Sequence, residues 1–213
     1  MTKGIPPIDG RNILDRARRN GRREHAVSGR TFPASSAKEP AMMTVMLDPL
    51  SATDKAKLRN LIPATEDIDW PSQLALTAGW RVANGEYHRR QRELGRREMQ
   101  ALMASLGLAP GMDAVRAKEL VMTATEVFLQ TDAMKVVSRV KDGDLRLYCT
   151  RCPLYERFLD HRWGGLTACG CFARHQGWFD ALDAGLEEEL IMNRKWGDPV
   201  CQVAVRVKGP RAA

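Results

Sequence analysis

The chain has 213 residues, a formal net charge of +7, 44% hydrophobic residues and 28% charged residues. This length suits one well-packed domain with a tail, and the composition excludes a wholly disordered chain. No run approaches the roughly 20 apolar residues that cross a bilayer, and the N-terminus lacks the apolar core of a secretory signal, so we expect a cytoplasmic protein without a membrane span.

The first forty residues carry most of the excess positive charge. Residues 1–40 contain nine Lys or Arg and four Asp or Glu, so this segment holds +5 and the rest of the chain only +2. Its mixture of Pro, Gly, Ser and Arg is typical of a flexible basic arm. Because the remainder is nearly neutral, the charge distribution disfavours nucleic-acid binding. We predict an arm over 1–40 and a single domain over 41–213, with a helical part (41–133) and a cysteine-rich part (134–208).

Three amphipathic helices are expected in the first half of the domain. The first covers about Ala52–Leu61 and follows Ser51, a candidate N-cap. A long helix covers roughly Trp80–Leu106 and ends before Gly107. The third covers about Asp113–Gln130, where apolar residues recur at intervals of three and four.

Two hairpins are expected in the second half. In Lys135–Cys149 apolar residues recur at every second position, as in a strand, instead of at the helical spacing of about 3.6. Asp142-Gly143 divides this segment, and this dipeptide favours a two-residue turn. This turn places Val136 opposite Cys149, so Cys149 faces the core. The second hairpin covers about Glu188–Val207, and the alternation of its last strand turns Cys201 inward as well.

Two further helices are expected between the hairpins. One follows Pro153, since proline suits the first turn of a helix, and the other covers about Leu166–Leu182. Two hairpins can join in one antiparallel sheet on which helices pack. We therefore predict an α+β fold, with a helical N-terminal half on a sheet made from two C-terminal hairpins.

All five cysteines and two of the four histidines lie within residues 149–201, a cluster that indicates reduced thiols. One interpretation is an activated nucleophile. Cys171 and His175 lie four residues apart on the expected helix, and the helix dipole favours a thiolate near its start. Cys152, at a junction between strand and helix, competes with Cys171 for this role. The plainest alternative is that each cysteine is a small buried apolar residue.

Two other interpretations of the cluster remain open. Cys149-x-x-Cys152 has the spacing of a zinc knuckle, but Cys169 and Cys171 on one helix would point about 200° apart, so we predict no metal and no cofactor. The third interpretation is a pocket that senses a ligand without turnover. Its aromatic walls would be Trp163, Trp178, Phe172 and Phe179.

The order of these motifs resembles that of a known family. Cys152-Pro153, a cysteine on a following helix (Cys171), then Gly197-Asp198 and Cys201 in a terminal hairpin are similar to the L-2-amino-thiazoline-4-carboxylic acid hydrolase family. Thiol-rich domains similar to 4-vinyl reductase share part of this pattern. The chain departs from the family at Arg174-His175, where an acidic residue is usual. The resemblance implies a hydrolase that opens a small nitrogen-containing ring at a C–N bond.

This resemblance suggests roles for individual residues. Cys171 or Cys152 would be the nucleophile and His175 the general acid or base. The partners would be a small heterocyclic substrate and further copies of the chain in a homo-oligomer. The alternative is a non-catalytic module, either a thiol-rich ligand sensor or a zinc-stabilised regulator. The residues expected to bind substrate are Cys201, Trp178, Phe172, Trp163 and His161.

Overall fold

The computed structural model describes residues 50–62, 70–131, 134–141, 143–152, 155–156 and 169–209. These residues belong to the second of the two units into which the chain divides, Val45–Ala213. The expected basic arm lies outside the described residues, and so does most of the expected helix after Pro153.

Helices dominate the first half of this unit. They are α2 (Ala52–Leu61), α3 (Trp70–Ala78), α4 (Trp80–Ser105) and α5 (Ala114–Phe128). The side chains of Ser51 and Asp113 cap α2 and α5 by accepting hydrogen bonds from backbone N–H groups of the first turn. Gly107, with φ of +64°, follows the end of α4. Three of these helices confirm the predictions. Helix α3 was not predicted, because Pro71 is its only buried residue and no apolar period marks it.

The second half contributes an antiparallel sheet. Its strands are β1 (Lys135–Lys141), β2 (Asp144–Arg151), β3 (Leu186–Met192) and β4 (Cys201–Val207), in the order β1-β2-β4-β3. Val136 pairs with Cys149 as predicted, and Gly143 turns the first hairpin with φ of +77°. A 3-10 turn, η1 (Arg194–Trp196), lies between β3 and β4. The α+β fold is therefore confirmed.

Helix α7 (Cys171–Leu182) connects the two hairpins. It was predicted to begin at about Leu166, but Gly170 is its N-cap, and Cys169 stands outside the helix. The predicted angle of about 200° between the side chains of Cys169 and Cys171 assumed that both residues were helical. With Cys169 in non-helical backbone, the two thiols are free to meet.

Glycines allow α4 and α7 to approach closely. A Cβ atom built on Gly177 of α7 would lie 2.0 Å from the carbonyl oxygen of Arg92. A Cβ atom built on Gly95 of α4 would lie equally close, at 2.0 Å, to the carbonyl oxygen of Arg174. Backbone therefore packs directly on backbone, and this contact fixes the position of α7.

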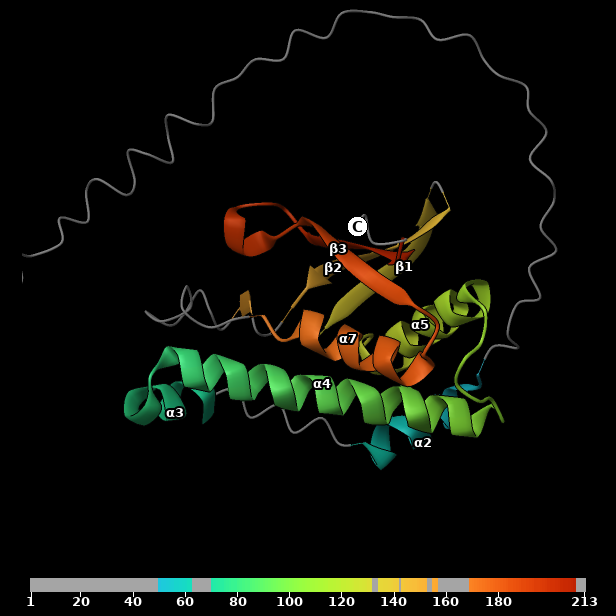
Figure 1. The fold of residues 1–213 in the computed structure, drawn as a ribbon, viewed down its shortest axis with the longest axis horizontal. Coiled ribbons are helices and arrows are strands. Elements are labelled where there is room, and N and C mark those ends of the chain that lie inside the picture. The colour runs from blue at the N-terminus through green and yellow to red at the C-terminus, as the bar shows by residue number, and fades with distance from the viewer. Residues whose placement is uncertain are drawn as a thin grey trace, which may run out of the picture. The chain divides into compact units, whose positions relative to one another are not determined.

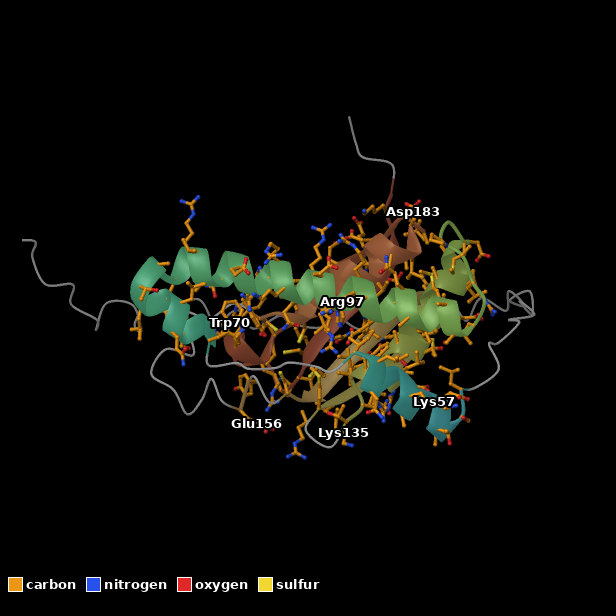
Figure 2. The ribbon with its side chains drawn as sticks, turned by 90° about the horizontal axis from the view of Figure 1, so that it is seen from below. Lys57, Trp70, Arg97, Lys135, Glu156 and Asp183 are labelled. Atoms are coloured by element: carbon orange, nitrogen blue, oxygen red, sulfur yellow. The ribbon has the colours of Figure 1, made fainter. Side chains whose placement is uncertain are left out.

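Figure 1 shows α5 and α7 lying between the long helix α4 and one face of the sheet. Figure 2, seen from below, shows α4 running across the view past Arg97, with Trp70 of α3 towards one end and Lys57 of α2 towards the other. None of the described helices combines the length and the apolar character needed to cross a membrane. Fully buried side chains from every layer form the core, among them Leu102, Leu120, Leu145, Trp178 and Val205.

Candidate functional site

An apolar cavity of about 50 Å³ lies among the strands β1, β2 and β4, the start of α7 and the residues that flank these elements. Aliphatic side chains form much of its wall. All five cysteines of the chain also line it, together with Phe172, His175 and Asn193. Thiols far apart in the sequence therefore meet around one enclosed space. The aliphatic lining residues are Leu129, Met134, Val136, Leu147 and Val203.

Sheet register explains why these cysteines converge. Cys149 and Cys201 are direct partners on the neighbouring strands β2 and β4. Each alternates with a buried aliphatic residue, so both side chains turn toward the helices. Cys152 follows the end of β2, and the remaining two cysteines flank Gly170, the N-cap of α7.

Four of the thiols affect one another's acidity. The neighbouring thiol of Cys152 raises the pKa of Cys149, and burial raises it further. The Cys149 thiol donates to the carbonyl oxygen of Arg151, with 3.3 Å between Sγ and O. Bonds to Cys152 and Cys169 together with burial raise the pKa of Cys171 well above its ordinary value. Both thiols therefore stay protonated at neutral pH.

Cys169 differs from the other thiols. Hydrogen bonding from Cys171 lowers the pKa of Cys169, although burial acts in the opposite direction. The pKa of Cys201 moves upward because of burial, although its sulfur accepts the backbone N–H of Arg194 at 3.4 Å. Cys169 is therefore the thiol that its surroundings favour as a thiolate.

His175 supplies a polar position in the apolar wall. Its Nδ1 atom lies 2.8 Å from the Oε2 atom of Glu188, and both side chains are buried. Because a carboxylate only accepts hydrogen bonds, Nδ1 carries a proton, and a neutral ring then has Nε2 as an acceptor. This Nε2 atom is buried and has no hydrogen-bond partner among the described residues. The cavity therefore contains an unused hydrogen-bonding position.

A larger, open hollow of about 440 Å³ adjoins the same residues. Cys169, Phe172 and Asn193 line both the cavity and the hollow. None of the described residues that line the hollow is acidic, and burial lowers the pKa of Lys195 in its wall. The other lining residues are His88, Leu190 and Trp196.

The structure brings together most of the residues that were expected to form a site. Cys152, Cys171, Cys201, Phe172 and His175 all line the cavity. Trp178 does not line it, since this fully buried side chain bonds to Glu98 of α4. Trp163 and His161 lie outside the described residues.

Cys169 and Asn193 line both spaces and were not among the expected site residues. The signal that could have identified Cys169 is Gly170, a residue that can end a helix pattern and so separate Cys169 from the helix. Asn193 follows β3 and carries no comparable sequence signal. Within the described residues, no group of three or more His, Cys, Asp or Glu side chains has an arrangement that could hold a metal ion.

No family model matches the chain, and no curated protein matches it. Among solved structures, a trafficking protein particle complex subunit 3 from Naegleria fowleri, covalently bound to palmitic acid, matches with 15% identity and a TM-score of 0.42. The match covers 74% of this chain and 94% of that chain. A likeness of this size transfers neither that subunit's role nor its ligand to this chain.

The prediction of a ring-opening hydrolase is wrong on these comparisons. The hydrolase family suggested by the motif order finds no match, and the solved structure described above is a trafficking subunit. The site adds a physical reason, because Cys171, an expected nucleophile, has a raised pKa and remains a thiol. The assignment to the amino-thiazoline hydrolase family, the enzyme activity, the heterocyclic substrate and the homo-oligomer are not retained.

Proposed function

We propose that this chain is a non-catalytic ligand-sensing module that binds a compact carboxylate with one polar group at the far end of its tail. The observation that carries the proposal is the wall shared by the cavity and the hollow, made of Cys169, Phe172 and Asn193. A ligand lying across this wall has its head in the open hollow and its tail in the enclosed cavity. Sites of this kind, apolar with a few polar groups, are typical of small-ligand binding.

The walls of the hollow favour an anionic head. Lys195 contributes a cationic side chain to the wall of the hollow. His88 also lines the hollow, and its buried Nε2 atom has no hydrogen-bond partner among the described residues. A carboxylate accepts hydrogen bonds from both kinds of side chain, so a head of this type satisfies the site.

The cavity favours a short apolar tail that ends in a hydroxyl or another hydrogen-bond donor. Its aliphatic and sulfur-bearing wall suits methylene groups, which gain about 0.8 kcal/mol each on leaving water. The Nε2 atom of His175 is a buried polar atom in the cavity wall with no hydrogen-bond partner among the described residues, and leaving such an atom unpaired is costly. A hydroxyl at the end of the tail removes this cost.

The thiols fit a module that detects its ligand without turning it over. The raised pKa values of Cys149, Cys171 and Cys201 keep these residues as uncharged wall groups. Five reduced thiols also suit a cytoplasmic protein, and we include this location in the proposal. We also retain as a proposal the division into a basic arm over 1–40 and a domain over 41–213.

Two matched probes test the proposal. Hexanoate and 6-hydroxyhexanoate differ only in a terminal hydroxyl, and each can be titrated against the full chain by saturation-transfer NMR. We expect 6-hydroxyhexanoate to bind about fivefold more tightly, which corresponds to one hydrogen bond of about 1 kcal/mol. His175→Phe should abolish this preference while leaving hexanoate binding in place.

The charged head has its own test. Lys195→Gln should weaken both probes by the same factor, because both carry the same carboxylate. Lys57→Gln is the matched control, since Lys57 is exposed on α2 and pairs with Asp54. Binding of neither probe, or an equal loss in the two lysine variants, would overturn the proposal.

A further inference from the structure

The five cysteines are reduced thiols, and their arrangement suggests chemistry that ligand binding does not use. Cys169 lines both the open hollow and the enclosed cavity, so its sulfur stands where a small reactant can reach it from solvent. Cys171 follows Gly170, two residues after Cys169, and lines the same cavity, as Cys152 does. An accessible thiol with a second thiol nearby is the arrangement in which oxidation by a peroxide can end in a disulfide.

We propose that Cys169 is an oxidative modification site for hydrogen peroxide and that Cys171 is its resolving thiol. In the first step the Cys169 thiolate attacks one peroxide oxygen and the O–O bond breaks. Sulfenic acid forms on Cys169, and the released hydroxide takes up a proton to become water. The sulfur is oxidised by two electrons and the peroxide is reduced by two.

The second step forms a disulfide. Cys171 loses its proton and its sulfur attacks the sulfenic sulfur of Cys169. The S–O bond breaks, the S–S bond forms, and the leaving hydroxide combines with the Cys171 proton to give water. Two thiols and one hydrogen peroxide thus give one disulfide and two waters. The raised pKa of Cys171 fits this order, since Cys171 reacts only after Cys169 has been oxidised.

The open hollow selects Cys169 as the site of first attack, because Cys169 is the one of the five cysteines that lines it. The lowered pKa of Cys169, caused by hydrogen bonding from Cys171, supports this choice. Cys201 bonds instead to Asn193 and to the backbone of Arg194. Cys201 therefore serves as an internal comparison within the same cavity.

Peptide mass spectrometry tests the modification on the full chain. Trypsin releases Trp163–Arg174, which contains both Cys169 and Cys171, and Cys152–Arg157, which contains Cys152 alone. After treatment with one equivalent of hydrogen peroxide and alkylation, we expect Trp163–Arg174 to be two hydrogens lighter and free of alkyl groups. A link between the two peptides would assign resolution to Cys152 and overturn the role given to Cys171.

Variants separate the two steps. Cys171→Ser keeps a hydroxyl donor to Cys169 but cannot form the disulfide, so dimedone should trap sulfenic acid on Cys169. Cys169→Ser should lower the rate of thiol loss at least about tenfold, whereas Lys57→Gln, at an exposed position on α2, should leave it unchanged. Oxidation of all five thiols at similar rates would overturn the proposal. The NMR titrations of the two carboxylates use reduced protein, and the oxidation experiments use no carboxylate. A failure to bind ligand and a failure to form the disulfide can therefore be told apart.

Discussion

Glu98 of α4 and Trp178 of α7 are joined by a hydrogen bond of 2.9 Å between the carboxylate Oε2 atom and the indole Nε1 atom, and both side chains are fully buried. Arg174 donates to both oxygens of the same carboxylate, from Nε at 2.9 Å and from Nη2. A buried carboxylate is tolerated only with such donors. This network holds α7, and therefore Cys171 and His175, against α4.

Replacing Glu98 tests the importance of this network for stability. Glu98→Ala leaves the guanidinium of Arg174 buried without its anion, so we expect a loss of about 3–5 kcal/mol in the free energy of unfolding. Urea denaturation followed by tryptophan fluorescence measures this loss. Glu93→Ala is the control, because Glu93 pairs with Arg96 at the surface and should cost at most about 1 kcal/mol. Equal losses in the two variants would contradict a buried network.

The backbone contact between α4 and α7 gives a second prediction. In Gly177→Ala the new methyl group would meet the carbonyl oxygen of Arg92 at 2.0 Å, and neither backbone can move easily. We expect a loss of about 1–3 kcal/mol, as for other overpacked cores. Gly85→Ala, on an open part of α4, should instead gain about 0.5–1 kcal/mol because alanine favours helix. Thermal unfolding of both variants measures the difference, and shifts of the same sign would disprove the close approach.

Filling the cavity gives a third prediction. Val136 lines the cavity, whereas its neighbour Val137 is 38% exposed. Val136→Phe places a ring where the ligand tail is proposed to lie, so it should remove the preference for 6-hydroxyhexanoate over hexanoate. Val137→Phe should keep that preference. The same NMR titrations measure both variants, and a preference that survives in Val136→Phe would place the tail elsewhere.

The fold could be predicted wherever local chemistry alone determines structure. The side chains of Ser51 and Asp113 cap their helices within the same turn, and Gly143 forms the turn that sets the pairing of Val136 with Cys149. Each of these signals lies within a few residues of its effect. Helix α3 gave no such signal, since its position depends on packing against α4 rather than on an apolar face of its own.

The site was only partly predictable, because its chemistry depends on contacts between distant segments. Alternation within strands was enough to turn Cys149 and Cys201 inward. The direction of each pKa shift could not be predicted from the sequence, since it depends on burial and on which thiols are neighbours in the fold. Cys171 was expected to be the thiolate because it begins a helix, yet the pKa of Cys171 is raised and that of Cys169 is lowered. Burial and hydrogen bonding here outweigh the helix dipole.

The reactivity of Cys169 should therefore show a distinctive pH dependence. The thiolate is the nucleophile, so alkylation by iodoacetamide follows the fraction of ionised sulfur. Because the pKa of Cys169 is lowered, this residue should stay reactive at pH values where a free cysteine, with a pKa of about 8.5, is largely protonated. Its rate should fall only as the pH drops through the lowered value. The same shift contributes stability that is present above the unfolded pKa and is lost as the pH falls through the folded pKa.

Removing the donor to Cys169 should reverse this behaviour. In Cys171→Ala the sulfur of Cys169 loses its side-chain hydrogen bond, so the midpoint of its alkylation profile should move to higher pH and its rate at pH 7 should fall. Cys171→Ser, which keeps a hydroxyl donor, should retain most of the reactivity. Quantifying alkylated Trp163–Arg174 across the pH range measures all three proteins. Identical profiles for the alanine and serine variants would show that the hydrogen bond from residue 171 does not set the acidity of Cys169.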